Sequence, residues 1–201
     1  MEQAFLARHA ESESSTRGLT NGDPRTAVPL TAEGREQARR LGDLLADTEL
    51  DLCVTSEFER TQETADLALA GRDVPRIVLP GLNDIRFGQF EGGPLREYRA
   101  WARAHGPSAE APGGGESRLE TVRRYVEAFQ TVLERPEATI LLVAHSLPIR
   151  YVLDACDSRA PAAAVEQVPY AEPFAVDSTQ LERAVDRLDA WTLAPTWHRR
   201  N

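Results

Sequence analysis

Two short apolar runs, far apart in the chain, each end in a histidine. Residues 4–7 lead into Arg8-His9, and residues 140–144 lead into His145. Short apolar runs of this kind predict buried β-strands. In an open α/β sheet, ligands bind at the carboxyl ends of the strands. The two histidines therefore predict one site that folding assembles from both halves of the chain.

Strands and helices are predicted to alternate along the chain. The predicted strands are Gln3–Arg8, Asp51–Thr55, Arg76–Leu79 and Thr139–Ala144. Helices are predicted after the N-cap Thr31, over Phe58–Leu69, after the capping box of Ser117 and Glu120, over Leu147–Ala155, and through Leu181, Val185, Leu188 and Trp191. This alternation predicts an α/β fold, a three-layer α/β/α sandwich with a mostly parallel central sheet.

Two segments are predicted to be irregular. Gly18–Pro29 is rich in Gly, Asn, Asp and Pro, and Pro107–Gly115 ends in three glycines, so we expect the second loop to be mobile. No break in composition and no internal repeat divides the chain. Residues 1–201 are therefore predicted to form a single domain, with a lid-like segment at about 87–115.

Composition limits the partners. Lys and Arg number 23 against 32 Asp and Glu, a net charge of -9, which argues against binding to nucleic acid or to an anionic membrane. The chain starts without a signal peptide and has no long apolar run, so we expect a cytoplasmic protein.

Cys53 and Cys156 are predicted to be small buried hydrophobes, with a disulfide as the less favoured alternative. His105 and His198 are expected at the surface.

The strand ends carry residues suited to phosphoryl chemistry. A guanidinium can hold a phosphate through two parallel hydrogen bonds, and an imidazole nitrogen can attack phosphorus. Arg60 follows the second predicted strand, and Asp84 follows the third. One sheet edge would therefore gather Arg8, His9, Arg60, Asp84 and His145. This set predicts cleavage of a phosphomonoester without a metal ion.

Six motifs occur in a fixed order over roughly residues 1–155: Leu6–Ser12, Leu30–Ala38, Thr55–Ala65, Phe87–Gly92, Gly114–Ser117 and Val143–Ser146. Together they resemble the motifs of the histidine phosphatase superfamily, which is also called the phosphoglycerate mutase-like superfamily. The resemblance implies a phosphoglycerate mutase-like α/β fold and a phosphatase that needs no cofactor or metal.

The resemblance also implies roles for individual residues. His9 would be the nucleophile and form a phosphohistidine, with a neighbouring acceptor fixing its tautomer. Arg8, Arg60 and His145 would surround the phosphoryl group, and Asp84 would protonate the leaving oxygen. The resemblance further places Ser15 and Ser146 among the groups that bind the phosphate.

This chain departs from the family pattern at four positions. Asp84 stands where a glutamate is usual and reaches less far, so Glu11 is an alternative proton donor. Ala10 and Ser146 each replace a glycine, and Ser15 replaces an asparagine that binds phosphate.

The substrate is expected to be a small phosphate ester. Arg86, Arg96, Arg99 and Arg103 lie in or beside the lid-like segment, and we expect one or more of them to contact an anionic ester. Sugar phosphates, phosphoglycerate-like acids and nucleotide-like esters all remain open, as does the choice between a monomer and a homodimer. The alternatives to a phosphatase are a mutase, which returns the phosphoryl group to its substrate, and a non-catalytic relative that binds a phosphate ligand.

Overall fold

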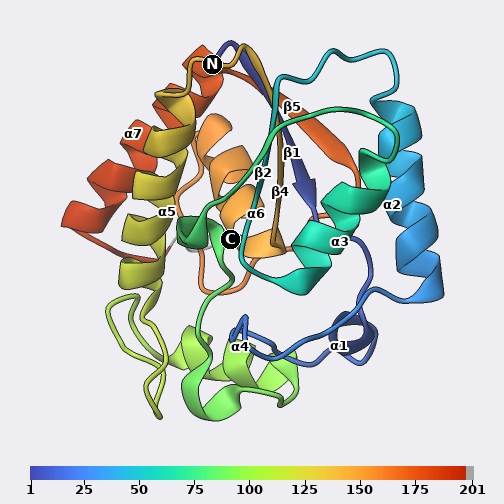
Figure 1. Ribbon diagram of the computed structural model, residues 1–201. Coiled ribbons are helices and arrows are strands. Elements are labelled where there is room, and N and C mark those ends of the chain that lie inside the picture. Colours follow the sequence, from blue (N-terminus) through green and yellow to red (C-terminus); the bar gives the residue numbers. More distant parts are fainter. Residues whose placement is uncertain (198–201) are drawn as a thin grey trace.

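A five-stranded sheet forms the centre of the protein, a computed structural model that describes residues 1–197 (Figure 1). The strand order is β3-β2-β4-β1-β5. The strands are β1 (Gln3–Arg8), β2 (Leu52–Thr55), β3 (Arg76–Val78), β4 (Thr139–Ala144) and β5 (Pro173–Asp177). All neighbouring strands run parallel except β5, which is antiparallel to β1. The predicted, mostly parallel sheet is confirmed.

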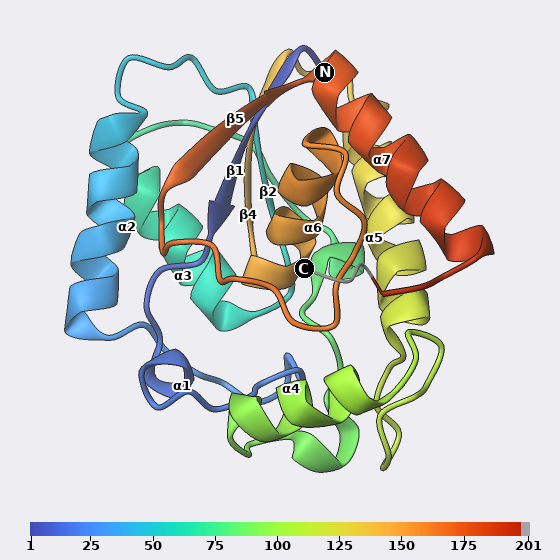
Figure 2. The ribbon, with the colours of Figure 1, turned by 180° about the vertical axis from the view of Figure 1, so that it is seen from behind.

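Helices cover both faces of the sheet. One face carries α2 (Ala32–Leu44) and α3 (Glu59–Ala68); the other carries α5 (Arg118–Leu133), α6 (Ser146–Cys156) and α7 (Ser178–Leu193), as Figures 1 and 2 show from opposite sides. The two short helices α1 (Glu13–Thr16) and α4 (Leu95–Ala104) lie beyond the end of the sheet at which β1 terminates. Two 3₁₀ turns, η1 (Pro80–Leu82) and η2 (Gly88–Phe90), complete the described elements. These layers confirm the three-layer sandwich.

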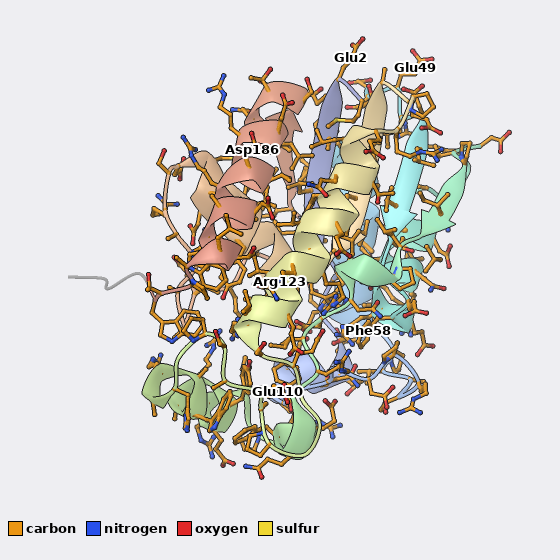
Figure 3. The ribbon with its side chains drawn as sticks, turned by 90° about the vertical axis from the view of Figure 1, so that its left-hand side faces the viewer. Glu2, Glu49, Phe58, Glu110, Arg123 and Asp186 are labelled. Atoms are coloured by element: carbon orange, nitrogen blue, oxygen red, sulfur yellow. The ribbon has the colours of Figure 1, made fainter. Side chains whose placement is uncertain are left out.

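The register of β1 and β4 sets the position of both histidines. Arg8 pairs with Ala144, and the backbone N–H of His9 donates to the Ala144 carbonyl at 2.8 Å. Both strands run in the same direction, so His9 and His145 leave the sheet side by side. Figure 3 shows Phe58, which follows β2, toward the end of the sheet opposite Glu2.

Close packing places α2 against the loop that follows His9. Thr31 caps the helix by accepting from the Gly34 N–H, and its own N–H donates to the Glu11 carbonyl. A Cβ on Gly34 would lie 2.0 Å from that same carbonyl oxygen. Only glycine therefore fits at this contact between the helix and the loop.

The structure adds β5 and α4, together with the short elements α1, η1 and η2, none of which the sequence patterns predicted. Strand β5 lies at the edge of the sheet and begins at Pro173. A proline is tolerated there, because its missing N–H costs the sheet interior no hydrogen bond between strands. Helix α4 occupies part of the lid-like segment, with Tyr98 and Ala102 as its buried residues.

The glycine-rich loop, expected to be mobile, is held by backbone hydrogen bonds. Pro112 accepts from Gln89 at 2.6 Å, and Gly115 donates to Ala111 at 3.0 Å. A Cβ on Gly88, which has a φ of +59°, would lie 2.2 Å from the Pro112 oxygen. The loop therefore packs directly against the turn that precedes α4.

Several further expectations can be compared with the described residues. Cys53 is buried, Cys156 is partly buried, and both are free thiols. His105 is exposed, as expected, whereas His198 lies outside the described residues. None of the helices in residues 1–197 combines the length and the apolar character that a membrane crossing requires.

Candidate active site

A cavity of about 340 Å³ opens at the carboxyl ends of the strands. Arg8, His9, Arg60 and Asp84 line it. Arg8 is the last residue of β1, and the other three come from the segments that follow β1, β2 and β3. His145 is fully buried and reaches this group through Arg60. The structure thus brings together all five residues that the sequence predicted at one sheet edge.

The hydrogen bonds of His9 fix its tautomer. Its Nδ1 lies 2.7 Å from the carbonyl oxygen of Ala10, which can only accept, so Nδ1 carries the proton. On the other side of the ring, Nε2 accepts from Nε–H of Arg60 at 3.2 Å. Burial lowers the pKa of His9 well below its usual value, with further lowering by Arg60 and Arg8. His9 is therefore neutral, and its unprotonated Nε2 faces the guanidinium of Arg60.

His145 is held as a neutral ring by a similar set of contacts. Its Nδ1 accepts from Arg60 at 3.1 Å, so its Nε2 carries the proton and donates to the Ser56 hydroxyl at 2.9 Å. Ser56 in turn lies 2.9 Å from the Thr61 hydroxyl. Burial, followed by Arg60 and His9, lowers the pKa of His145 well below its usual value.

Arg60 is hydrogen-bonded to both histidines, and only 4% of its surface is exposed. Asn21 orients it, because the Asn21 side-chain oxygen accepts from Nη1 and the Asn21 carbonyl accepts from Nη2 at 3.1 Å. Burial lowers the pKa of Arg60 to about 10 against the opposing effect of Asp84, so the group stays charged at neutral pH. The sequence analysis missed Asn21; its position in the predicted loop Gly18–Pro29 was the one available signal.

Arg8 has hydrogen-bonding capacity left over for a ligand. Its Nη1 donates to the Val168 carbonyl at 2.9 Å, and its guanidinium carbon lies 3.9 Å above the ring centre of Tyr170. Its Nε is buried and has no hydrogen-bond partner. A buried N–H without an acceptor is costly, so an anion in the cavity would satisfy it. Tyr170 lies beyond the motifs, and no sequence signal identified it.

Asp84 lies at the same distance from two of these groups. Its Oδ2 is 3.9 Å from Nη2 of Arg60 and 3.9 Å from Nδ1 of His145, and its Oδ1 accepts from the Ile85 N–H at 3.0 Å. Burial raises the pKa of Asp84, while Arg60 opposes the shift. A carboxyl group with a raised pKa at the edge of a phosphate-sized site can deliver a proton to a leaving oxygen.

The side chains of the other predicted site residues, Ser15, Ser146 and Glu11, are hydrogen-bonded to other groups of the protein. Ser15 lines the cavity, but its hydroxyl donates to the Ser12 carbonyl at 2.8 Å. Ser146 starts α6, and its hydroxyl accepts from the Val168 N–H at 2.9 Å. The Glu11 carboxylate accepts from the Thr31 hydroxyl at 2.8 Å, which directs it toward α2 and away from His9.

The four arginines of the lid region divide into two pairs. Arg96 and Arg99 line the cavity. Arg86 instead lies 3.5 Å from Glu116, and Arg103 is exposed near the end of α4. Within residues 1–197, no cluster of three or more His, Cys, Asp or Glu side chains has the arrangement of a metal site.

Comparisons with known proteins identify the family. The family model of the histidine phosphatase superfamily (branch 1) matches residues 4–192. An adenosylcobalamin/alpha-ribazole phosphatase of Salmonella typhimurium is 35% identical over 151 residues, which cover 70% of this chain and 72% of that protein. A 2,3-bisphosphoglycerate-dependent phosphoglycerate mutase of Gloeobacter violaceus is 30% identical over 194 residues, covering 88% and 86% of the two chains.

Solved structures give the same result for the fold. The crystal structure of the alpha-ribazole phosphatase from Shigella flexneri superimposes with a TM-score of 0.74 at 31% identity, covering 87% of this chain and 90% of that one. Sequence, fold and the assembled histidines and arginines lead to one conclusion: this chain belongs to branch 1 of the histidine phosphatase superfamily.

Proposed function

We propose that this chain is a phosphomonoesterase that hydrolyses a small phosphate ester through a phosphohistidine on His9. The observation that carries the proposal is the geometry of His9, which lines the cavity: its Nδ1–H is bound to the Ala10 carbonyl, so its Nε2 carries no proton and accepts from Arg60. Family membership and the alpha-ribazole phosphatase relatives are consistent with phosphomonoester hydrolysis. Those relatives also support a small ester as the substrate class.

In the first step, Nε2 of His9 attacks phosphorus and the bond from phosphorus to the ester oxygen breaks. Asp84 gives its proton to the departing oxygen, so an alcohol leaves and a carboxylate remains. Arg8 and Arg60 hold the equatorial phosphoryl oxygens and compensate their charge, which is the main task in phosphoryl transfer. Nε of Arg60 exchanges its contact with His9 for one with a phosphoryl oxygen.

In the second step, water attacks the phosphohistidine. The Asp84 carboxylate accepts a proton from the water as the new oxygen–phosphorus bond forms, and the bond from phosphorus to Nε2 breaks. Inorganic phosphate then leaves, and His9 and the protonated Asp84 are restored. The Ala10 carbonyl keeps the proton on Nδ1 throughout, so His9 is ready for the next cycle.

We further propose that this activity needs no metal ion, because the guanidinium groups of Arg8 and Arg60 supply positive charge at the site of the phosphate. The proposed enzyme uses residues 1–201 as one domain, with residues 87–115 as a lid. Backbone hydrogen bonds join the lid to the loop Gly18–Pro29. The Leu95 N–H donates to the Gly18 carbonyl at 2.8 Å, and the Thr20 N–H donates to the Gly93 carbonyl at 2.9 Å. Free thiols at Cys53 and Cys156 fit a reducing compartment, the cytoplasm.

Hydrolysis of an aryl phosphate tests the proposal. We expect phosphate release by the wild type, full activity in the presence of a chelator, and loss of activity in His9→Ala. A trapped phosphoenzyme should be labile in acid and stable in base, as a phosphoramidate is. A requirement for added magnesium, or a His9→Ala variant that keeps its activity, would contradict the mechanism.

A second candidate function is that of a mutase, which the similarity to the phosphoglycerate mutase of Gloeobacter violaceus favours. A mutase would isomerise a phosphorylated metabolite without releasing phosphate, whereas a phosphatase releases it. Incubating a panel of phosphorylated metabolites with the protein, and following both products, separates the two. A non-catalytic phosphate binder would give neither product.

A further inference from the structure

A closed ring of hydrogen bonds starts and ends at Arg60 and passes through the proposed nucleophile. The Nε–H of Arg60 donates to Nε2 of His9 at 3.2 Å, and Nδ1 of His9 donates to the Ala10 carbonyl at 2.7 Å. The Ala10 N–H donates to the Thr64 hydroxyl at 3.0 Å, and that hydroxyl donates to the Arg60 carbonyl at 2.6 Å. Thr64 is the member of this ring to which the proposed mechanism gives no role.

The chemistry of its members fixes the direction of each bond in the ring. A backbone N–H can only donate and a carbonyl oxygen can only accept, so the Thr64 hydroxyl accepts from Ala10 and gives its own hydrogen to Arg60. Thr64 and Ala10 are both fully buried, so water cannot take the place of the hydroxyl. A valine at this position would keep the shape of the side chain and leave the buried Ala10 N–H without its acceptor.

A second side chain holds the peptide on the other side of Ala10. The Ala10 carbonyl and the Glu11 N–H belong to one planar peptide unit, and this N–H donates to Oε1 of Gln37 at 2.9 Å. The peptide is therefore hydrogen-bonded at both edges, to Gln37 through its N–H and to His9 through its carbonyl. Gln37 lies on α2 and Thr64 on α3, so two helices on one face of the sheet hold the backbone that follows His9 (Figure 1).

The position of the Ala10 carbonyl decides which ring nitrogen of His9 carries the proton. If this carbonyl turned away, Nδ1 would lose its acceptor and the proton could move to Nε2, which would then have no lone pair for attack on phosphorus. We propose that Thr64 and Gln37 are positioning residues, which hold the backbone on either side of Ala10 and so keep the proton of His9 on Nδ1. This assignment rests on the proposed role of His9 as the nucleophile.

Two measurements on Thr64→Val, Thr64→Ser and Thr121→Val test the assignment. The first is the ¹⁵N spectrum of labelled imidazole rings, which reports whether Nδ1 or Nε2 is protonated; His9→Gln identifies the signals of His9. The second is kcat and KM for an aryl phosphate. Thr121 is the matched control, because it is equally buried, its hydroxyl also donates to the carbonyl four residues earlier, and it does not line the cavity.

We expect the wild type to show His9 with its proton on Nδ1, and Thr64→Val to show a measurable population with the proton on Nε2. In Thr64→Val, kcat should fall by about tenfold or more with little change in KM, because the groups that bind the phosphate stay in place. Thr64→Ser keeps the hydroxyl and should restore both measurements, and Thr121→Val should match the wild type.

A tautomer of His9 that is unchanged in Thr64→Val would overturn the proposal, as would equal losses of kcat in Thr64→Val and Thr121→Val. If Thr64→Val does not fold, Gln37→Leu takes its place at a partly exposed position, with Gln37→Glu as the variant that keeps an acceptor. Failure of the wild type to release phosphate would instead contradict the phosphatase function, and the ¹⁵N spectra would still test how His9 is positioned.

Discussion

The Nε–H of Arg60 donates to Nε2 of His9 at 3.2 Å, so the proposed nucleophile and a proposed phosphate ligand are already in contact. This contact keeps Nε2 unprotonated and places it beside the guanidinium that would bind the phosphate. The same guanidinium reaches His145 through Nη2. One planar group thus orients both rings, a geometry that a lysine ammonium cannot reproduce.

Arg60→Lys is therefore expected to lower kcat/KM by about 100-fold or more, although the positive charge is retained. Steady-state kinetics with an aryl phosphate measure the effect. Arg35→Lys is the matched control, because Arg35 pairs with Glu63 away from the cavity. Similar losses in the two variants would contradict the role given to the planar guanidinium.

Asn21→Leu is expected to weaken phosphate binding by about tenfold, because it removes the acceptor of Nη1 on Arg60 and leaves a buried N–H group unpaired. The inhibition constant for inorganic phosphate measures this. Asn83→Leu should leave the constant unchanged, because Asn83 pairs with Glu57 and does not line the cavity. Unaltered inhibition by phosphate in Asn21→Leu would show that Arg60 holds its orientation without Asn21.

Asp84→Asn is expected to slow hydrolysis of alkyl phosphates by about 100-fold or more and to spare aryl phosphates with acidic leaving groups, which need no proton. The pKa of Asp84 is raised, so the acid form persists above the usual range and is lost as pH increases. Rates for alkyl phosphates should therefore fall on the alkaline side, while those for good leaving groups stay level. Equal losses for both ester classes would argue against an acid role.

Stability is expected to fall as the pH decreases below the usual histidine pKa of 6.5. His9 and His145 have lowered pKa values in the folded state, so the unfolded chain binds more protons there. Each histidine contributes stability that is present above pH 6.5 and is lost on acidification, by up to about 1.4 kcal/mol per pH unit. Asp84, with a raised pKa, acts in the opposite sense.

Urea unfolding at several pH values in an Asp84→Asn background isolates the histidine contribution. His145→Gln should reduce the slope of stability against pH by about half, because one of two buried histidines is gone. His105→Gln is the control, since His105 is exposed. A slope that His145→Gln does not change would contradict the lowered pKa of His145.

Glu116→Ala is expected to destabilise the fold by about 3 kcal/mol, because it breaks a salt bridge with one buried partner. Glu116 is 3% exposed and accepts from Arg124 at 3.0 Å and from the Arg86 N–H at 2.9 Å. Arg124 also donates to the Asp84 carbonyl at 3.3 Å, so activity on alkyl phosphates should fall as well. Glu110→Ala is the control, and Figure 3 places Glu110 in the segment beyond the sheet. Equal midpoints of unfolding in the two variants would contradict this prediction.

The sequence by itself determined the strands that carry the site. β1 and β4 coincide with their predicted ranges because short apolar runs between polar segments leave few alternatives. Parallel strands end at one sheet edge, so the sequence alone was enough to predict that His9, Arg60 and His145 lie close together. The capping box of Ser117 and Glu120 likewise fixed the start of α5, because its hydrogen bonds are local.

Only the tertiary structure decided what surrounds those residues. Asn21 and Tyr170 reach Arg60 and Arg8 from loops, whose paths depend on contacts between distant segments that no local pattern encodes. The packing of α4 likewise decides that Arg99 lines the cavity while Arg103 does not. Strand periodicity and motifs thus located the phosphate chemistry, whereas the orientation of each ring and the lining of the cavity arise from long-range packing.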